Sequence, residues 1–199
     1  MCPLLETIRC ESGVLQNLLQ HQERLDNSQK ALFSSFQNIS LKILTVPEEF
    51  KNGLFKCRVI YSESIESVEF LPYQLPKIQS LKLVVNDEIE YRHKFADRSD
   101  IQKMFETRGD ADDILIVKYG QITDTSYANI IFFDGKNWLT PEWPLLLGVQ
   151  RAKLLFSEKK IMQANIIPAD LPKFSKARLI NAMIRFEDEV DLNIGSIIS

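Results

Sequence analysis

The spacing of apolar and polar positions in the first part of the chain predicts one helix followed by a pair of strands. Apolar side chains recur at helical intervals among Gln, Glu, Asp and Lys, which predicts an amphipathic helix over Val14–Phe36. The apolar stripe of this helix consists of Leu18, Leu25, Leu32 and Phe36. Two later runs, Cys57–Tyr61 and Val68–Leu71, lie on either side of a polar connection and predict paired strands.

A different alternation fills the second half of the chain, after a proline-containing segment, Tyr73–Ile78, that predicts an extended linker. The strands expected there are Leu81–Val85, Ile114–Lys118, Ile130–Phe133, Ile166–Ile167 and Arg178–Met183, with a hairpin turn at Asp134-Gly135 leading into Trp138-Leu139. This mixed order predicts an α+β fold rather than a doubly wound parallel sheet. The linker divides the chain into a small N-terminal α/β domain, residues 1–76, and a larger C-terminal domain, residues 77–199.

Two short helices are expected within the second half. Ser99 and Gln102 have the spacing of a capping box, and Gly109 provides a stop for the first helix. Gly148 opens the second helix. The apolar faces are Ile101, Met104 and Phe105 in the first helix, and Val149, Ala152, Leu155 and Phe156 in the second.

Composition and charge narrow the class of protein. The chain has 199 residues and a net charge of -3, so no sequence-wide basic field indicates nucleic-acid binding. Its apolar runs are too short for a membrane span, and the N-terminus has no basic region followed by a long apolar stretch. Three cysteines (Cys2, Cys10 and Cys57) lack metal-ligand spacing, and the two histidines lie far apart. We therefore expect a cytoplasmic protein with reduced thiols and no metal site.

One stretch of the chain carries an ordered set of residues that together suit a cofactor enzyme. The set is Lys94, Arg98, Thr123-Asp124, Asn129 before an apolar strand, Thr140-Pro141 and Gly148-Val-Gln-Arg151. In this order the chain resembles the fold-type-IV pyridoxal-phosphate (PLP) enzymes, the class IV aminotransferase family, and within it aminodeoxychorismate lyase. The resemblance implies the two-domain fold of the D-amino acid aminotransferase-like enzymes.

Lys94 stands where this family places its Schiff-base lysine. A lysine in that role must have an amine that can be neutral, which requires desolvation or a neighbouring cation. Arg92, His93 and Arg98 are close in sequence and could lower the pKa of the amine. From the charge pattern alone, Lys94 would be a surface lysine in a charged loop, so the catalytic role is implied by the resemblance.

The resemblance also assigns a partner to the cofactor's pyridine nitrogen. The family usually has Thr-Glu where this chain has Thr123-Asp124, so the ring must sit closer or a water must bridge. Without the family context, Asp124 would be a turn residue. Asn129 matches the asparagine before the family's apolar strand, and we expect it to hold the turn.

Phosphate anchors follow from two further motifs. The segment His21-Gln-Glu-Arg24-Leu resembles the family helix whose arginine grips the phosphate, a role that suits a guanidinium fork. The N–H groups of Val149 and Gln150 open a helix and suit an anion, although Gln150 replaces the family's threonine. Asn181 and Ala182 resemble the lyases' loop edge near the phosphate and substrate, or else form a buried strand end.

The resemblance extends over most of the chain, beginning with Leu5-Glu-Thr-Ile-Arg9. The strand and Asp-x-Gly segment that normally precede this motif in the family are missing, and the C-terminal end is short. The resemblance therefore implies the family fold in an N-terminally shortened form, and it leaves open which residues wall the substrate pocket.

The first hypothesis for the chemistry is aminodeoxychorismate lyase, which forms 4-aminobenzoate for folate biosynthesis and releases pyruvate. Arg58 and Arg92 are candidates for binding the two substrate carboxylates. The alternatives are an aminotransferase of branched-chain or D-amino acids, and a non-catalytic PLP-binding protein. The resemblance further implies a homodimer, with aminodeoxychorismate synthase as a functional partner.

Overall fold

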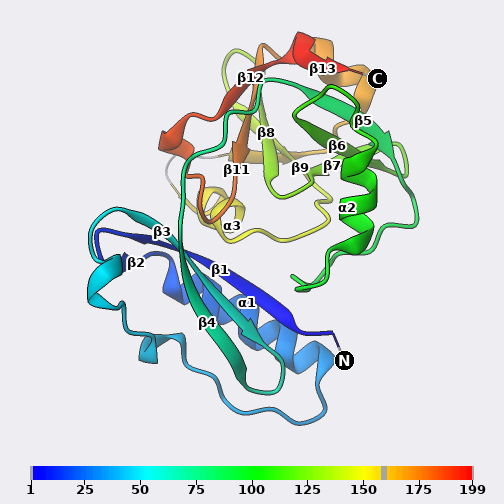
Figure 1. The fold of residues 1–199 in the computed structure, drawn as a ribbon. Coiled ribbons are helices and arrows are strands. Elements are labelled where there is room, and N and C mark those ends of the chain that lie inside the picture. Colours follow the sequence, from blue (N-terminus) through cyan, green and yellow to red (C-terminus); the bar gives the residue numbers. More distant parts are fainter. Residues whose placement is uncertain (1, 158–160, 199) are drawn as a thin grey trace. The chain divides into compact units, whose positions relative to one another are not determined.

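The computed structural model describes residues 2–157 and 161–198 of the chain (Figure 1). The chain forms two compact units. Unit 1 comprises Met1–Gln74 and His93–Asp97, and unit 2 comprises Leu75–Arg92 and Arg98–Ser199. This division differs from a single cut after residue 76 in two respects: the first boundary follows Gln74, and the segment that contains Lys94 returns to unit 1.

Unit 1 is an antiparallel sheet with one helix packed on its face (Figure 1). Its elements are β1 (Leu4–Glu11), β2 (Val14–Leu15), α1 (Leu18–Leu32), β3 (Leu54–Tyr61) and β4 (Ile65–Pro72), with 3-10 turns at Leu41–Ile43 and Glu48–Phe50. The strand order is β2-β1-β3-β4. Alternate residues of β1 and β3 face the helix, so that Ile8 and Val59 pack in one apolar cluster with Leu25 of α1.

The predicted strand pair of unit 1 is confirmed, whereas the predicted helix is too long. Val59 pairs with Val68 in the antiparallel register of β3 and β4. The chain before α1 instead turns back at Gly13, whose φ of 77° is left-handed, and forms β2 against β1. The helix ends at Leu32, and Phe36 lies beyond it, partly exposed.

Unit 2 is built on a mixed sheet (Figure 1). Its strands are β5 (Leu81–Val85), β6 (Asp113–Lys118), β7 (Gln121–Thr125), β8 (Asn129–Phe133), β9 (Trp138–Pro141), β10 (Ile161–Ala164), β11 (Lys176–Ile180), β12 (Asp191–Asn193) and β13 (Ile197–Ile198). Its helices are α2 (Ser99–Glu106) and α3 (Val149–Leu155), with 3-10 turns at Pro168–Lys173, Phe186–Asp188 and Ile194–Ser196. The order β10-β9-β8-β7-β6-β5-β13 contains parallel and antiparallel neighbours, and β11 pairs with β8 and β12. The predicted α+β class is therefore confirmed.

The core of unit 2 is formed by side chains from several neighbouring strands of the sheet. Leu115, Ile130 and Leu179, from three different strands, are completely buried in one cluster. These strands carry apolar residues at nearly every position because both of their faces are covered. The central strands therefore form a buried base for the polar residues at their ends.

Several local predictions for unit 2 were wrong. The cap position of α2 belongs to Arg98, which makes no side-chain cap bond, so Ser99 is the first helical residue and not the cap of a capping box. Asp124 lies within β7 rather than in a turn. Phe156 follows the last residue of α3 and is 93% exposed, while Leu154 takes the buried position.

Two late strands also end elsewhere than expected. Ile166–Ile167 is not a strand, although the carbonyl of Ile166 accepts a bond from Ile122, and the strand in this region is β10. β11 ends at Ile180, since Asn181 turns the chain.

Within the described parts of the chain, no helix is long and apolar enough to cross a membrane.

Candidate active site

The backbone of Lys94 is fastened to the first strand of unit 1. The carbonyl of Lys94 accepts a hydrogen bond of 2.8 Å from the N–H of Leu5, and the N–H of Ala96 donates to Pro3 at 2.8 Å. Phe95 forms an antiparallel bridge with Leu4. These bonds add the Lys94 segment alongside β1, where its half-buried side chain is held by neighbouring sheet structure rather than by a free loop.

A buried charged cluster lies between β1 and α1. Glu6 is completely buried and accepts two hydrogen bonds from Arg24, Nε to Oε1 at 2.8 Å and Nη2 to Oε2 at 2.5 Å. His21 Nδ1 lies 2.6 Å from the same Oε2. Burial raises the pKa of Glu6, but the charge of Arg24 and the bonds from both neighbours outweigh it and lower this pKa to about 2. Glu6 is therefore ionised at neutral pH.

His21 is neutral in this cluster. Burial lowers its pKa, and although Glu6 raises it, the charges of Arg24 and Lys94 lower it further. A carboxylate can only accept, so Nδ1 carries the proton and Nε2 holds a lone pair. Nε2 is buried and has no hydrogen-bond partner among the described residues. The Nε2 atom of His21 is therefore a buried acceptor, and the charge of Lys94 acts on its ring.

The other histidine, His93, is turned toward α1. Its Nδ1 lies 3.3 Å from the hydroxyl of Ser28, and the Ser28 hydroxyl also bonds to buried Tyr61. Burial raises the pKa of Tyr61 well above its ordinary value. These contacts make His93 a packing partner of the helix.

Unit 2 holds a second buried carboxylate, Asp124. Asn129, its cross-strand partner, donates from Nδ2 to Asp124 Oδ1 at 2.7 Å, and the N–H of Leu146 donates to Oδ2 at 3.0 Å. Burial raises the pKa of Asp124 to about 6, although the bonds from Asn129 and Leu146 and the charge of Arg151 lower it. A buried carboxylate with a raised pKa is poorly compensated, and a cation or an N–H donor placed beside it would favour its ionised form.

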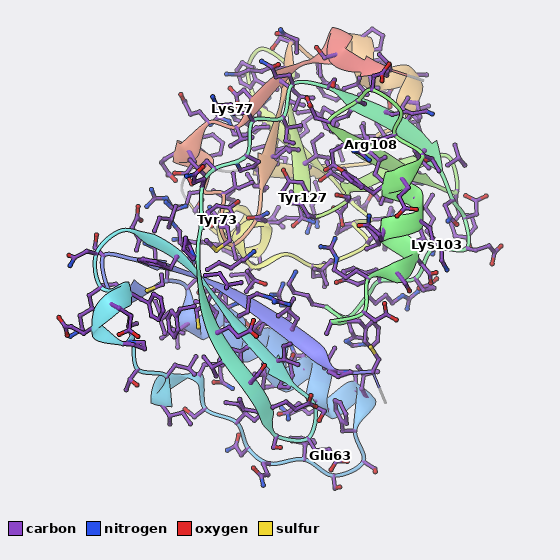
Figure 2. All side chains as sticks on the ribbon, viewed as in Figure 1. Glu63, Tyr73, Lys77, Lys103, Arg108 and Tyr127 are labelled. Carbon is purple, nitrogen blue, oxygen red and sulfur yellow. The ribbon has the colours of Figure 1, made fainter. Side chains whose placement is uncertain are left out.

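Asn129 organises the loop that leads into α3, not the turn that precedes β8. Its Nδ2 also donates to the carbonyl of Leu146 at 3.0 Å. Gly148 approaches so closely that a Cβ there would lie 2.0 Å from Asn129 Oδ1. The turn between β7 and β8 is held by Thr125, whose hydroxyl and N–H bond to Ala128, and it carries Tyr127, labelled in Figure 2.

Helix α3 places three consecutive buried residues beyond Gly148. Arg151 donates from Nε to Thr140 at 3.2 Å and from Nη2 to the carbonyl of Pro141 at 2.8 Å. Val149 and Gln150 are each 3% exposed, and the Oε1 atom of Gln150 has no partner among the described residues. This end of unit 2 therefore combines a buried polar amide with a guanidinium that lowers the pKa of Asp124.

The remaining predicted residues lie in less buried surroundings. Asn181 Oδ1 accepts the N–H groups of Met183 and Ile184 at 2.8 and 2.9 Å, so Asn181 and Ala182 belong to a reverse turn. Arg58 pairs with Glu69 across β3 and β4 at 3.2 Å, and the Arg92 side chain is 85% exposed beside Glu90. Among the predicted residues, Lys94, Arg24 and Arg58 lie in unit 1 and the others lie in unit 2.

Sequence reasoning did not single out Glu6 or Arg151 as parts of these clusters. Glu6 could have been found as a charged residue at an inward position of β1, because it lies between buried Leu4 and Ile8 on the helix-facing side. The sequence motifs contain Thr140-Pro141 and Arg151, but they do not show that Arg151 of α3 bonds to these two residues of β9.

A match to a known family covers nearly the whole of this arrangement. The class IV amino-transferase family matches residues 3–186, a span that includes both buried carboxylates and Lys94. The chain belongs to the class IV aminotransferase family. As a member it is a PLP-dependent enzyme of the fold-type-IV group, which confirms the family and enzyme class predicted from its motifs.

Individual relatives agree with this membership. An uncharacterized protein of Haemophilus influenzae is 39% identical over 186 residues, which are 92% of this chain and 98% of the relative. The crystal structure of a protein from Haemophilus somnus 129PT, proposed to be a 4-amino-4-deoxychorismate lyase, is 34% identical. It has a TM-score of 0.83 and covers 94% of this chain and 98% of its own. The match therefore extends over nearly the whole of both chains.

A third similarity concerns the fold alone. A hypothetical aminotransferase from Mycobacterium tuberculosis, solved in a PLP-bound form, has a TM-score of 0.72 at 15% identity. It covers 98% of this chain and 81% of its own. The fold-type-IV architecture expected from the sequence is thereby confirmed for this class IV aminotransferase.

Proposed function

We propose that this class IV aminotransferase family member is a PLP-dependent lyase that converts 4-amino-4-deoxychorismate to 4-aminobenzoate and pyruvate. The observation that carries the reaction type is the 34% identity, over nearly the whole of both chains, to the Haemophilus somnus protein proposed to catalyse this reaction. The Lys94-x-x-Asp97-Arg98 and Asn181-Ala-Met183 motifs, which resemble those of the lyases, support the same choice.

The residues of each unit fit the cofactor chemically. In unit 2, Asp124 is a buried carboxylate that a protonated ring nitrogen would stabilise, and Asn129 holds it in place. Buried Val149 and Gln150 carry the N–H groups proposed for the phosphate, and the Gln150 side chain has a buried atom without a partner among the described residues. In unit 1, Arg24 carries a guanidinium whose Nε and Nη2 donate to Glu6, and a guanidinium suits a phosphate dianion. Asn181 and Ala182 stay proposed as contacts near the phosphate.

Lys94 is proposed as the catalytic base. Bound PLP supplies an electron sink for the charge that develops when a proton leaves the substrate carbon. The Lys94 Nζ would accept that proton, which requires a neutral amine at the moment of transfer. Asp124 would keep the ring nitrogen protonated, and Arg24 would hold the phosphate. Arg58 and Arg92 stay proposed as ligands of the two substrate carboxylates.

A borohydride experiment tests the catalytic lysine before any assay of turnover. Borohydride makes a reversible bond between the cofactor aldehyde and an amine permanent, and peptide mapping then locates the labelled residue. We expect the label on Lys94. A label on another lysine would refute the assignment to Lys94, and no label in PLP-saturated protein would favour a non-catalytic binding protein.

A product assay tests the reaction. Incubation with 4-amino-4-deoxychorismate should release 4-aminobenzoate and pyruvate in equal amounts. Formation of a keto acid from branched-chain or D-amino acids, without 4-aminobenzoate release, would instead establish an aminotransferase. We also propose a homodimer, which sedimentation analysis would test, and aminodeoxychorismate synthase as the source of substrate.

A further inference from the structure

Glu6, Arg24 and His21 form a polar cluster within the otherwise apolar interior of unit 1. Glu6 is on the inward face of β1, flanked by completely buried Leu4 and Ile8. Removing a carboxylate and a guanidinium from water is unfavourable, and such pairs are often no more stabilising than apolar residues of equal size. Stability therefore does not explain why the chain places a charged pair here.

Two hydrogen bonds to Glu6 fix the orientation of the Arg24 guanidinium, which a simple attraction between the two charges would not do. Glu6 Oε1 and Oε2 receive Nε and Nη2, the two donors on one edge of the planar guanidinium. His21 Nδ1 contacts Oε2 at 2.6 Å and limits movement of the carboxylate. The Arg24 side chain is 13% exposed, whereas the Glu6 and His21 side chains are completely buried. Two buried groups thus orient one partly accessible cation.

We infer that Glu6 is a positioning residue that, braced by His21, holds the Arg24 guanidinium in the orientation needed to bind the cofactor's phosphate. This inference rests on the proposed function, because it assigns the phosphate to Arg24. Glu6 acts through Arg24 and does not contact the phosphate, since like charges would repel. Its loss should therefore weaken recognition of the phosphate group and leave recognition of the rest of the cofactor unchanged.

The test compares two ligands that differ only in the phosphate. Equilibrium dialysis of the apoprotein measures the dissociation constants of PLP and of pyridoxal. The pyridoxal constant divided by the PLP constant reports phosphate recognition. Glu6→Gln keeps the size of the side chain and removes its charge. We expect Glu6→Gln to weaken PLP binding by about tenfold or more, the effect of misplacing one charge-assisted contact, with pyridoxal binding unchanged within about twofold.

Two further variants give the comparison its controls. Glu11→Gln makes the same substitution on the same strand and removes a carboxylate that pairs with Arg9 at 3.1 Å, and it should leave the ratio unchanged. Arg24→Gln should lower the ratio as Glu6→Gln does. In the double variant the second substitution should add little, because Glu6 acts only through Arg24.

The outcomes separate this inference from the proposed function. Equal weakening of both ligands by Glu6→Gln, with a lower melting temperature of the apoprotein, would mean a purely structural role and overturn the inference. An unchanged ratio would overturn it as well. If Glu6→Gln does not fold, Glu6→Asp keeps the charge but is too short for the two-bond contact, and the same selective loss is expected of it. Wild-type protein that fails to bind PLP would overturn the proposed function, and the inference with it.

Discussion

The raised pKa of Asp124 predicts that this residue destabilises the apoprotein at neutral pH. Its pKa rises from 3.8 to about 6 on folding because of burial, so between these values the folded state retains a proton that the unfolded state has lost. The free energy of unfolding must then decrease as the pH rises through this window. A shift of about two units corresponds to roughly 3 kcal/mol, fully developed above the folded-state pKa.

Asp124→Asn removes this titration while nearly preserving the size of the side chain. We expect the unfolding free energy of wild type, relative to Asp124→Asn, to fall by about 2 kcal/mol between pH 4.5 and pH 7.5. Replacing one carboxylate oxygen by an NH2 group disturbs the bonds from Asn129 and Leu146, but the resulting loss of unfolding free energy does not depend on pH in this range. Other buried carboxyls, such as Asp113, titrate in both proteins and cancel in the difference.

Urea denaturation of the apoprotein at several pH values measures these free energies. Asp134→Asn is the matched control, because Asp134 is an exposed turn residue whose pKa is lowered by the N–H groups of Asn137 and Lys136. The contribution of Asp134 is present above its ordinary pKa and is lost as the pH falls, which is opposite in sign to that of Asp124. Parallel pH curves for wild type and Asp124→Asn would refute the reasoning, because the titrating group would then be elsewhere.

Three further substitutions test other features of the molecule. Lys94→Ala should abolish 4-aminobenzoate formation, measured by product fluorescence, with the melting temperature retained; turnover close to wild type would rule out Lys94 as the base. Gly148→Ala should lower the melting temperature, because its Cβ would lie 2.0 Å from Asn129 Oδ1, whereas Gly195→Ala, with no atom within 4 Å, should not. Equal melting temperatures for these two variants would contradict the close approach. Leu25→Ala should cost about 2–5 kcal/mol in urea denaturation, since this completely buried side chain leaves a cavity against the sheet; a loss below about 1 kcal/mol would mean that α1 is not packed there.

Several strands and the enzyme family could be predicted from the sequence, because their signals are local or depend only on the order of residues. Strands such as Ile114–Lys118 and Ile130–Phe133 are short apolar runs between turn residues, and that local signal survives in the folded protein. Lys94, Asp124 and the Gly148 motif occur in an order typical of one enzyme family, so their grouping did not depend on knowing any distance. The assignment of catalytic roles to these residues remains a prediction.

Helix and turn boundaries were less accessible, because non-local contacts decide them. Residues 14–15 lie in the helical pattern but pair as β2 with Cys10 and Glu11 after the turn at Gly13. Aspartate is a residue type common in turns, yet β7 continues through Asp124 because Asn129 of β8 lies opposite and donates a hydrogen bond to it. In both places a cross-strand partner outweighed the local preference.

The sequence by itself determined the class of enzyme, the α+β order of elements and the residue types available for cofactor chemistry. Only the tertiary structure decided how those residues are charged and oriented. Glu6 is ionised because Arg24 and His21 meet it from a helix more than ten positions away, whereas the pKa of Asp124 rises because the strands around it exclude water. Burial and ion pairing act through space between segments distant in the chain, so no local pattern of residues encodes their balance.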